Sequence, residues 1–368
     1  MKQPGYMLVF CLMMIGLVTA MVTSIVNRAR VHAVTMSIML EREKARALAL
    51  SGLELAKSFL ANPVETEKGE EKAEAAQAGK PGEPEKQKDP AQEGRNFLSV
   101  VLPNLARYQK FTVMEGGKPY GTIKINMGCE SGKINLNKIY DFSKHAFIGE
   151  GDKQLDIKPF IEQVCSAIEK SQDSKGLFEK LSSLLHDRKF PLNDVTEVLT
   201  SKEFGVAFQN AVFLNPVDDE KKPEKKEGEK EAPPLLYLTD IFTVFSKDAS
   251  IDPWLLSPSL KQILGLKQPT KEQEKVINES LQKFSLSATW ATDWNQKLAP
   301  LYGKDFATLP PSFAAMLSTK FEPMVFSVVS YGSIKNISEK LYAIIERKKS
   351  SKKDGPLYEI VVKRLYWL

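Results

Sequence analysis

The sequence predicts an α+β fold in which a long N-terminal helix packs on an antiparallel sheet and a large α-helical insertion interrupts that sheet. Three observations predict it. An apolar run at the N-terminus continues as an amphipathic helical pattern, alternating apolar and polar runs occur in two separate parts of the chain, and a mostly helical pattern lies between these parts. The chain of 368 residues has room for two domains.

The N-terminal helix is expected to cover residues 6–61, with residues 6–26 crossing a membrane. These first 21 residues contain no charged side chain, and at about 1.5 Å per residue they span roughly 30 Å, the hydrocarbon thickness of a bilayer. Only a helix crosses lipid with its backbone hydrogen bonds satisfied from within. Beyond Arg28, apolar and small residues recur at helical spacing up to Asn62–Pro63, which predicts one continuous helix. They are Ala45, Leu48, Gly52, Leu55, Ala56 and Phe59.

Three interpretations of this N-terminus compete. A cleaved secretory signal has a shorter apolar core than the run found here. A plain signal anchor has no need of a helix that continues beyond the membrane. The third is a prepilin-type leader at residues 1–5, ending in Gly5 and cut directly before Tyr6, with the helix retained. The continuous helix favours this third interpretation, because a pilin-like subunit builds its head on the second half of the same helix.

Alternation of apolar and polar residues predicts strands in two parts of the chain. Residues 96–150 should form the first part of an α/β head, with a hairpin around Gly116–Gly117. Residues 318–368 should form the C-terminal antiparallel strands of the same head, with turns at Gly332–Ser333 and Asp354–Gly355. The alternating runs are 108–114, 120–127, 323–331, 341–347 and 357–366.

The segment 151–317 between these parts has a mostly helical pattern and is the predicted insertion. Its clearest helical runs are 157–170, 176–186 and 271–284. Residues 62–95 and the loop 217–234 are rich in charge, Pro and Gly and have no apolar period. Such segments cannot bury enough apolar surface to offset the entropy of ordering, so we expect both to be disordered.

Composition argues against nucleic-acid binding and against catalysis. The chain has 51 Lys and Arg against 46 Asp and Glu, and it shows no basic stripe with interleaved aromatic residues. The three histidines, His32, His145 and His186, are scattered, and none lies near a Cys or a Gly-x-Ser-x-Gly motif. No nucleophile with a base is found, so we expect a protein that is not an enzyme. Trp290 and Trp294, four residues apart, are expected in the core.

The three cysteines do not by themselves predict a disulfide. Cys11 lies in the apolar run, and Cys129 and Cys165 have no characteristic spacing. Their pairing in an oxidising compartment stays open at this point.

One short motif is specific: Glu-Ser-Gly-Lys-Ile-Asn-Leu-Asn at residues 130–137. Gly132 permits a turn, and the alternation after it places two apolar side chains on one side and the amides of Asn135 and Asn137 on the other. Amides in this position can bond neighbouring backbone. The motif is not a phosphate-binding loop, because it lacks the spaced first Gly and the trailing Ser or Thr.

The leader, the end of the long helix at 45–56 and the Gly-Lys-Ile-Asn-Leu-Asn motif together resemble the general secretion pathway protein K family, the large minor pseudopilins of type II secretion. In that family an acidic residue, here Glu130, precedes a Gly-Lys/Arg-x-Asn-x-Asn motif, and a pilin-like fold carries a big helical insertion. Residues 190–199 resemble the family's segment ahead of its Thr-Val strand, here 241–246.

The resemblance implies a tip subunit that initiates and caps a pseudopilus for protein export. Its implied partners are the I-type and J-type minor pseudopilins, the major pseudopilin and a prepilin peptidase, with no nucleic acid. It implies a methylated, single-pass protein of the cell inner membrane with a cytoplasmic N-terminus and a periplasmic head. The orientation rests on the resemblance alone, because Arg28 and Arg30 follow the span and the charges do not favour a cytoplasmic N-terminus.

Two features of the span bear on assembly. Most pilin-like subunits carry Glu at the fifth position after the cut, where it neutralises a neighbouring amine within lipid. Phe10 occupies that position here. K-type subunits also lack the Glu, which suits a tip subunit because no further subunit lies above it. Gly16 and Ala20 are four residues apart, which allows another helix to approach closely.

The sequence also departs from the family pattern. The family's second Asn-rich motif has only a loose counterpart at residues 251–254. The resemblance allows calcium binding through acidic residues of the insertion, but no such ligands align here, so no metal ligand and no cofactor is assigned. Two alternative functions remain: a single-span membrane-anchored scaffold or receptor, and a minor pilin of a type IV pilus system.

Overall fold

We describe the protein from a computed structural model. It covers residues 4–61, 109–150, 156–214, 235–267, 290–319, 324–349 and 358–368, with side chains from Met7 onward. The expected disorder of residues 62–95 and 217–234 and the predicted helix at 271–284 lie entirely outside these described residues.

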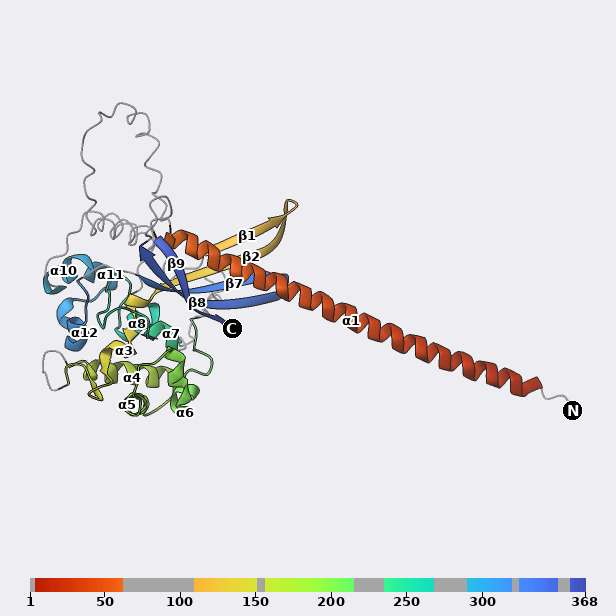
Figure 1. Cartoon of the computed structure of the whole chain (residues 1–368), viewed down its shortest axis with the longest axis horizontal. Coiled ribbons are helices and arrows are strands. Elements are labelled where there is room, and N and C mark those ends of the chain that lie inside the picture. The colour runs from red at the N-terminus through yellow and green to blue at the C-terminus, as the bar shows by residue number, and fades with distance from the viewer. Residues whose placement is uncertain are drawn as a thin grey trace, which may run out of the picture.

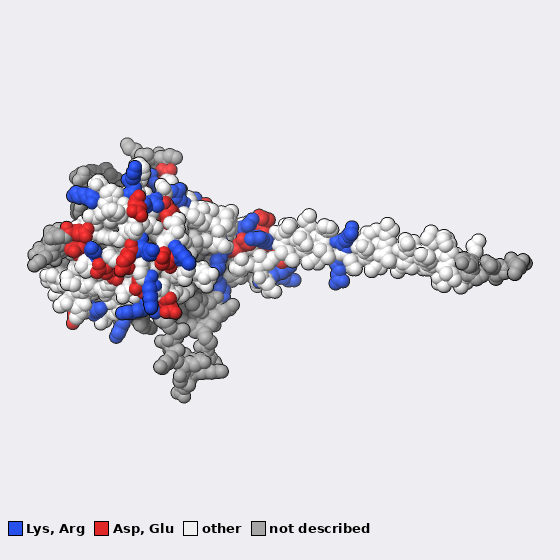
Figure 2. Space-filling model, turned by 90° about the horizontal axis from the view of Figure 1, so that it is seen from below, with Lys and Arg blue, Asp and Glu red and all other residues white. Residues whose placement is uncertain are grey.

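A single helix, α1 (Pro4–Ala61), dominates the shape of the molecule, and its 58 residues confirm the predicted continuous helix. Its first half projects away from the head, and its second half lies along the sheet (Figure 1). The segment Met7–Ala61 is long and apolar enough to cross a membrane by length and composition, and none of its most apolar window is buried within the chain. Figure 2 shows few charged side chains on the projecting part, whereas both signs of charge cover the head.

Three threonine hydroxyl groups of the projecting half of α1 are satisfied within the helix. Thr19 Oγ1 donates to the carbonyl oxygen of Ile15 at 2.8 Å, and Thr23 Oγ1 donates to that of Thr19 at 2.8 Å. Thr35 bonds the carbonyl oxygen of Val31 at 2.9 Å in the same way. Each hydroxyl therefore finds an acceptor one turn back and needs none outside the helix.

The second half of α1 packs on a five-stranded antiparallel sheet of order β1-β2-β7-β8-β9. The predicted hairpin is confirmed by β1 (Gln109–Glu115) and β2 (Lys118–Cys129). The predicted meander is confirmed by β7 (Val325–Ile334), β8 (Ile337–Lys349) and β9 (Tyr358–Trp367). β7 thus pairs with β2, a strand about two hundred residues earlier in the chain.

The prediction of a turn at Gly332–Ser333 is wrong. Both residues lie within β7, and the chain turns at Lys335–Asn336, between the paired residues Ile334 and Ile337. Lys335 adopts a left-handed φ of 51° there. The other predicted turn, Asp354–Gly355, lies outside the described residues.

Gly332 has a different purpose: it lets the helix approach the sheet. A Cβ at Gly332 would lie 2.0 Å from the carbonyl oxygen of Ala45 and 2.5 Å from the backbone nitrogen of Ala49. On the helix, a Cβ at Gly52 would lie 2.1 Å from Ser330 Oγ, which bonds the carbonyl oxygen of Ala49 at 2.7 Å. Two backbones therefore meet with only hydrogen atoms between them.

Apolar contacts and ion pairs complete this interface. Small and large residues alternate on the sheet-facing side of α1, where Ala45, Ala49, Leu53, Ala56 and Leu60 are buried. At the point where the helix leaves the head, Arg42 and Arg46 both bond the carboxylate of Glu339 on β8, the latter at 3.3 Å.

A block of short helices covers the end of the sheet opposite the projecting helix (Figure 1). The predicted helices at 157–170 and 176–186 are confirmed by α4 (Lys158–Gln172) and α5 (Leu177–His186). Further helical elements are η4 (Val195–Thr200), α6 (Lys202–Ala207), α7 (Leu238–Ile241), α8 (Pro258–Ile263), α10 (Trp290–Lys297), α11 (Ala299–Tyr302), η6 (Phe306–Thr308) and α12 (Pro311–Ala315).

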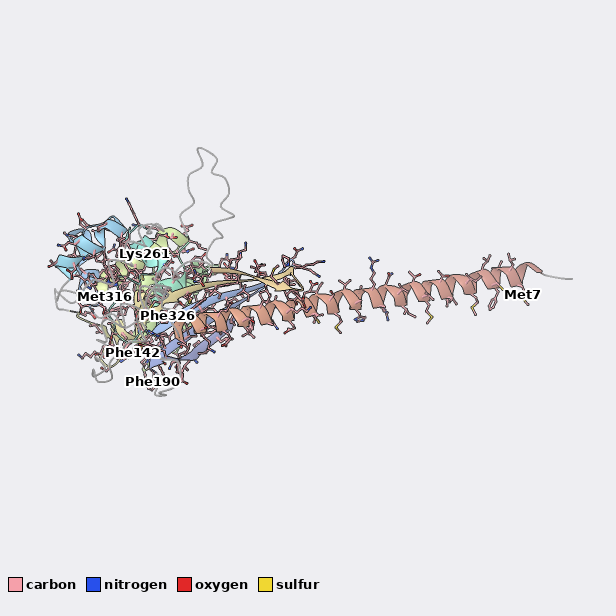
Figure 3. All side chains as sticks on the ribbon, turned by 90° about the horizontal axis from the view of Figure 1, so that it is seen from above. Met7, Phe142, Phe190, Lys261, Met316 and Phe326 are labelled. Carbon is pink, nitrogen blue, oxygen red and sulfur yellow. The ribbon has the colours of Figure 1, made fainter. Side chains whose placement is uncertain are left out.

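The helical block and the sheet share one main core. It runs from Leu53 on α1 through Phe326 on β7 to Phe160 on α4 and Trp294 on α10, all fully or almost fully buried. Trp290 and Trp294 lie in this core as predicted. Figure 3 places Phe326 between the helix and the block, with Met316 among the block's helices. A smaller cluster around Tyr342 and Ile344 fills the other face of the sheet.

Gly332→Ala is expected to lower the free energy of unfolding by about 1–3 kcal/mol, because its methyl group has to displace the backbone of α1. Thermal unfolding of the detergent-solubilised full chain measures the change. The matched control is Gly16→Ala, where a Cβ meets nothing within 4 Å and the melting temperature should not move. Equal melting temperatures for both variants would show that the helix does not approach β7 this closely.

Candidate functional site

The motif at residues 130–137 lies where strand β2 ends and the helical block begins. It passes through a turn of 3-10 helix, η3 (Glu130–Gly132), the short strand β3 (Ile134–Asn135) and a turn of helix, α3 (Leu136–Ile139). β3 pairs in parallel with β6 (Phe242–Thr243), which is the predicted Thr-Val segment. The predicted alternation therefore stops at Asn135, because the chain enters a helical turn there.

A buried ion pair forms the centre of the motif. Lys133 Nζ bonds the carboxylate of Glu130, and both side chains are only 2% exposed. The ammonium also donates to Ser327 Oγ on β7 at 2.9 Å, and the hydroxyl of Thr243 on β6 donates to the other carboxylate oxygen. Two charges buried this deeply are tolerated only when they pair and their remaining positions are hydrogen-bonded. The pair joins the sheet to the block.

Gly132 lies directly against another segment of the block. A Cβ on this residue would lie 1.7 Å from the carbonyl oxygen of Leu255, a distance that no side chain can occupy. The backbone nitrogen of Ser257 donates to the carbonyl oxygen of Gly132 at 3.2 Å, and that of Asp252 donates to Ser131 at 2.8 Å. The glycine is therefore required for backbone approach to residues 252–257, more than for the freedom of its own turn.

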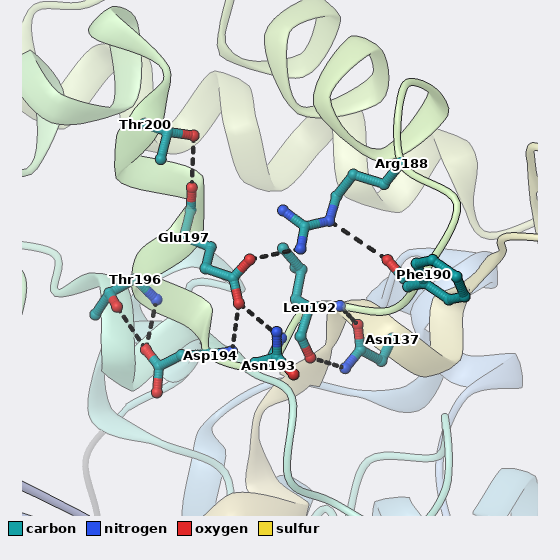
Figure 4. Close-up of polar contacts among 9 residues, drawn as sticks. All are labelled: Asn137, Arg188, Phe190, Leu192, Asn193, Asp194, Thr196, Glu197 and Thr200. Atoms are coloured by element: carbon teal, nitrogen blue, oxygen red, sulfur yellow. Dashed lines mark hydrogen bonds and ion pairs between the residues drawn. The ribbon is translucent and has the colours of Figure 1, made fainter.

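The two asparagines of the motif each hold a distant loop. Asn135 Nδ2 donates to the carbonyl oxygen and the hydroxyl of Ser246 at 2.7 and 2.8 Å, while its Oδ1 caps α3 by accepting from the Asn137 backbone at 3.0 Å. Asn137 bonds both backbone groups of Leu192, each at 2.7 Å (Figure 4). The prediction that these amides bond backbone is confirmed.

The loop that Asn137 holds is itself fixed by hydrogen bonds. Asp194 caps η4 by accepting from the Thr196 backbone at 2.8 Å, and Glu197 accepts from the backbone of Asn193 and Asp194 at 2.7 and 3.0 Å. Arg188 pairs with the second oxygen of Glu197 at 2.5 Å (Figure 4). The segment 190–199 is thus a loop that leads into η4 and is held by these hydrogen bonds.

The loose counterpart of the second family motif lies against this first motif. Asp252 is buried, its Oδ1 accepts from the Trp254 backbone at 3.0 Å, and its Oδ2 has no hydrogen-bond partner among the described residues. Burial raises the pKa of this carboxyl to about 8. Burial also raises the pKa of nearby Asp240, although Lys133 and the bonds from Ser259 oppose the shift.

These groups make a structural junction. Glu130 and Lys133 pair with each other, and the Asp240 carboxylate accepts from the Ser259 backbone, whereas Asp252 Oδ2 is buried without a partner among the described residues. Burial raises the pKa of the Cys129 thiol to about 12 and raises that of Cys165, so neither forms a reactive thiolate at neutral pH. Both cysteines are free, which answers the question of their pairing for this structure.

One expectation about the histidines needs correction. His145 and His186 are far apart in the sequence, but their rings lie 5.0 Å apart, and His145 Nδ1 contacts the carbonyl oxygen of His186 at 2.8 Å. Both are exposed on the block. Among the described residues, no group of three or more His, Cys, Asp and Glu is arranged to hold a metal ion, and these two rings have no third ligand.

The predicted residues of the N-terminal helix lie far from this junction. Gly5 and Tyr6 belong to the first turns of α1, and Phe10 is 61% exposed. Gly16 and Ala20 lie on the projecting half, where a side chain on Gly16 would touch nothing in the chain. The fold gathers the motif residues, whereas Phe10, Gly16 and Ala20 stay exposed and away from the junction.

Sequence reasoning missed several residues of the junction. Lys133 had a visible signal, since it stands three residues after Glu130 and such a pair meets on a helical turn. Ser246, Ser327 and Leu192 had none, because only the fold brings them to the motif.

Lys133→Met should lower the free energy of unfolding by about 3–5 kcal/mol, because it leaves the Glu130 carboxylate buried without a counterion. Glu130→Gln combined with Lys133→Met should be less destabilised than Lys133→Met alone. Urea unfolding of the full chain followed by circular dichroism measures both. A double variant no more stable than Lys133→Met would refute the pairing.

Asp252 should make the protein less stable as pH rises. The pKa of this carboxyl is about 3.9 in the unfolded chain, and burial raises it to about 8 in the folded protein. The folded state therefore binds more protons between these values, and stability falls as pH rises from 4 to 8. Asp252→Asn removes that slope, so its stability relative to the native chain should increase between pH 5 and pH 8. Parallel unfolding curves at the two pH values test this, and an unchanged difference would contradict it.

Comparison with known proteins adds a likeness among solved structures. No family model matches the sequence, and no curated protein matches it. The chain is similar in fold to a chain in the crystal structure of the GspK-GspI-GspJ complex from the enterotoxigenic Escherichia coli Type 2 Secretion System, with a TM-score of 0.36 and 14% sequence identity. The match covers 75% of this chain and 91% of that chain.

Proposed function

We propose that this chain is a minor pseudopilin of K type, a subunit that initiates and caps a short pseudopilus in a type II secretion system. Before assembly it is anchored in the inner membrane by the first half of α1, with its N-terminus in the cytoplasm and its head in the periplasm. Its partners are the I-type and J-type minor pseudopilins and the major pseudopilin. It acts by assembly and has no catalytic role.

The observation that carries this proposal is the division of α1 into two halves. One uninterrupted helix of 58 residues is exposed and apolar along its first half and packed on an antiparallel sheet along its second. Large apolar side chains between Met7 and Leu40 are more than half exposed. A receptor with one span needs no rigid connection between span and head. A subunit that moves as one body from the membrane into a filament needs such a rigid connection.

The N-terminus and the motif support the same proposal. Gly5 precedes the apolar run as a prepilin peptidase requires, and Phe10 replaces the usual carboxylate, as suits a subunit at the tip. The Gly-Lys-Ile-Asn-Leu-Asn motif connects the sheet to the helical insertion through Gly132, Asn135 and Asn137. That connection lets a pilin-like sheet carry a second body of helices without a flexible joint.

Gly5→Ala should abolish processing by a prepilin peptidase, because the residue before the cut then carries a side chain. The chain is co-expressed with the peptidase, purified, and its N-terminus determined by mass spectrometry. The native chain should begin at Tyr6, and the variant should keep residues 1–5. Gly16→Ala is the control and should be cut normally.

A native chain that keeps its leader in the presence of the peptidase would overturn the proposal in favour of a single-span scaffold or receptor. Processing followed by copurification with type IV pilins, in place of I-type and J-type pseudopilins, would move the chain to a pilus system.

A further inference from the structure

His145 and His186 meet where two separate segments of the helical block come together. His145 lies in the turn between the short strands β4 (Tyr140–Asp141) and β5 (Ala146–Phe147), which pair antiparallel. His186 is the last residue of α5, 41 positions further along the chain. Figure 1 shows α5 at the outer margin of the block. Both histidines are exposed, so two side chains of the kind that binds transition metals are open to solvent at this contact.

The separation of the two rings suits a shared metal ion. The ring centres lie 5.0 Å apart, and the ring planes are inclined at 57°. A zinc ion lies about 2.0–2.1 Å from an imidazole nitrogen and hence roughly 3.2 Å from the ring centre. Two imidazoles that share one ion at an angle of about 90–110° thus have ring centres about 4.5–5.2 Å apart. Because the observed separation lies in this range, small rotations of the exposed rings are sufficient to place a nitrogen of each on one ion.

A hydrogen bond prepares His145 as a ligand. Its Nδ1 lies 2.8 Å from the carbonyl oxygen of His186. A carbonyl oxygen only accepts, so Nδ1 carries the proton, and Nε2 of the neutral ring keeps its lone pair. Histidines that bind metals almost always donate their other ring N–H to a carbonyl or carboxylate oxygen, which orients the ring and makes the free nitrogen more basic. His145 has this arrangement.

The charges around the pair also permit a cation. Helix α5 has ten residues, and the carbonyl groups of its last turn, which ends at His186, carry partial negative charge. Lys144 and Arg188, the basic residues nearest the pair in the sequence, each lie near a carboxylate, at 3.7 and 2.5 Å. Asp187 and Lys189 are exposed and contribute opposite charges.

We propose that His145 and His186 form a binding site for a divalent transition-metal ion, for which Zn²⁺ is the probe. Each ring supplies one nitrogen, and His145 binds through Nε2. No third His, Cys, Asp or Glu joins them among the described residues, so water completes the coordination. Imidazole suits zinc, copper and nickel, whereas calcium takes oxygen ligands.

A bound ion fastens the turn between β4 and β5 to the end of α5. The first of these segments follows the Asn motif, and the second leads to the loop at 190–199 that Asn137 holds. The ion thus adds a second connection between the two segments. This inference stands on the histidine pair and does not depend on the proposed secretion function.

The test uses the full chain in detergent, purified without a histidine tag. Isothermal titration calorimetry with Zn²⁺ at pH 7.5 should show one ion bound per chain. At pH 5 the affinity should fall, because protons compete with the metal for the same nitrogens. Zn²⁺ should raise the temperature of thermal unfolding, since it binds the folded chain in preference to the unfolded one. It should also protect residues 140–147 and 177–186 from hydrogen–deuterium exchange, and Ca²⁺ should have none of these effects.

Two variants each remove one ligand. In His145→Asn the amide nitrogen takes the place of Nδ1 and can still donate to the carbonyl oxygen of His186, but nothing takes the place of Nε2. Asn also tolerates the left-handed backbone of this residue, whose φ is 52°. His145→Asn and His186→Ala should each weaken Zn²⁺ binding roughly tenfold or more. Without Zn²⁺, both should unfold at the temperature of the native chain.

His32→Ala is the matched control. It removes the remaining histidine of the chain, which is exposed on the projecting half of α1 and far from the block. Its affinity for Zn²⁺ should equal that of the native chain.

Three results would overturn the inference. The first is a native chain that binds no Zn²⁺ at pH 7.5. The second is unchanged binding in both His145→Asn and His186→Ala, which would place the ion elsewhere. The third is equal binding of Ca²⁺ and Zn²⁺, which would indicate oxygen ligands in place of imidazole. Circular dichroism confirms that each variant is folded before it is compared.

Discussion

The contact on which the rest of the structure depends is the approach of the α1 backbone to strand β7. Gly332 on the strand and Gly52 on the helix remove the side chains that would separate the two elements, and Ser330 bonds the helix backbone across the gap. Because the contact is backbone to backbone, it fixes the helix in both position and rotation. The direction in which the apolar half projects is therefore set by the sheet, some tens of ångströms away from the end of the helix.

The motif after β2 performs a comparable task for the other half of the head. Its residues bond segments that lie 55 to 194 positions further along the chain, at Leu192, Ser246 and Ser327. Most of these bonds join a buried side chain to a specific partner, and an unpaired group there would be costly. A buried ion pair adds little net stability by itself. Its effect is to make other arrangements of sheet and block unfavourable, and so to define one relative position.

Local patterns in the sequence were sufficient for the elements and insufficient for their junctions. The long helix, the hairpin and the three C-terminal strands follow from periodicity, since each buries one face along its length. The sequence suggests a turn at Gly332, but a glycine followed by a serine occurs both where a chain reverses and where another backbone passes close by. The sequence alone does not distinguish these two cases. The distant partners of Asn135 and Asn137, and Ser327 as a partner of Lys133, could not be predicted, because residues more than fifty positions apart share no periodic pattern in the sequence. The proximity of His145 and His186 was missed for the same reason.

The threonines of α1 have a consequence for how easily the helix changes its surroundings. Thr19, Thr23 and Thr35 each give their hydroxyl proton to a carbonyl oxygen one turn earlier. These three threonines then present no hydroxyl proton that requires an acceptor outside the helix. Hydrocarbon tails and the side chains of a neighbouring helix are nearly equivalent environments for such a surface. At these threonines, extraction of the helix from lipid into a bundle of helices exchanges one set of dispersion contacts for another, and their hydroxyl groups do not have to be rehydrated on the way.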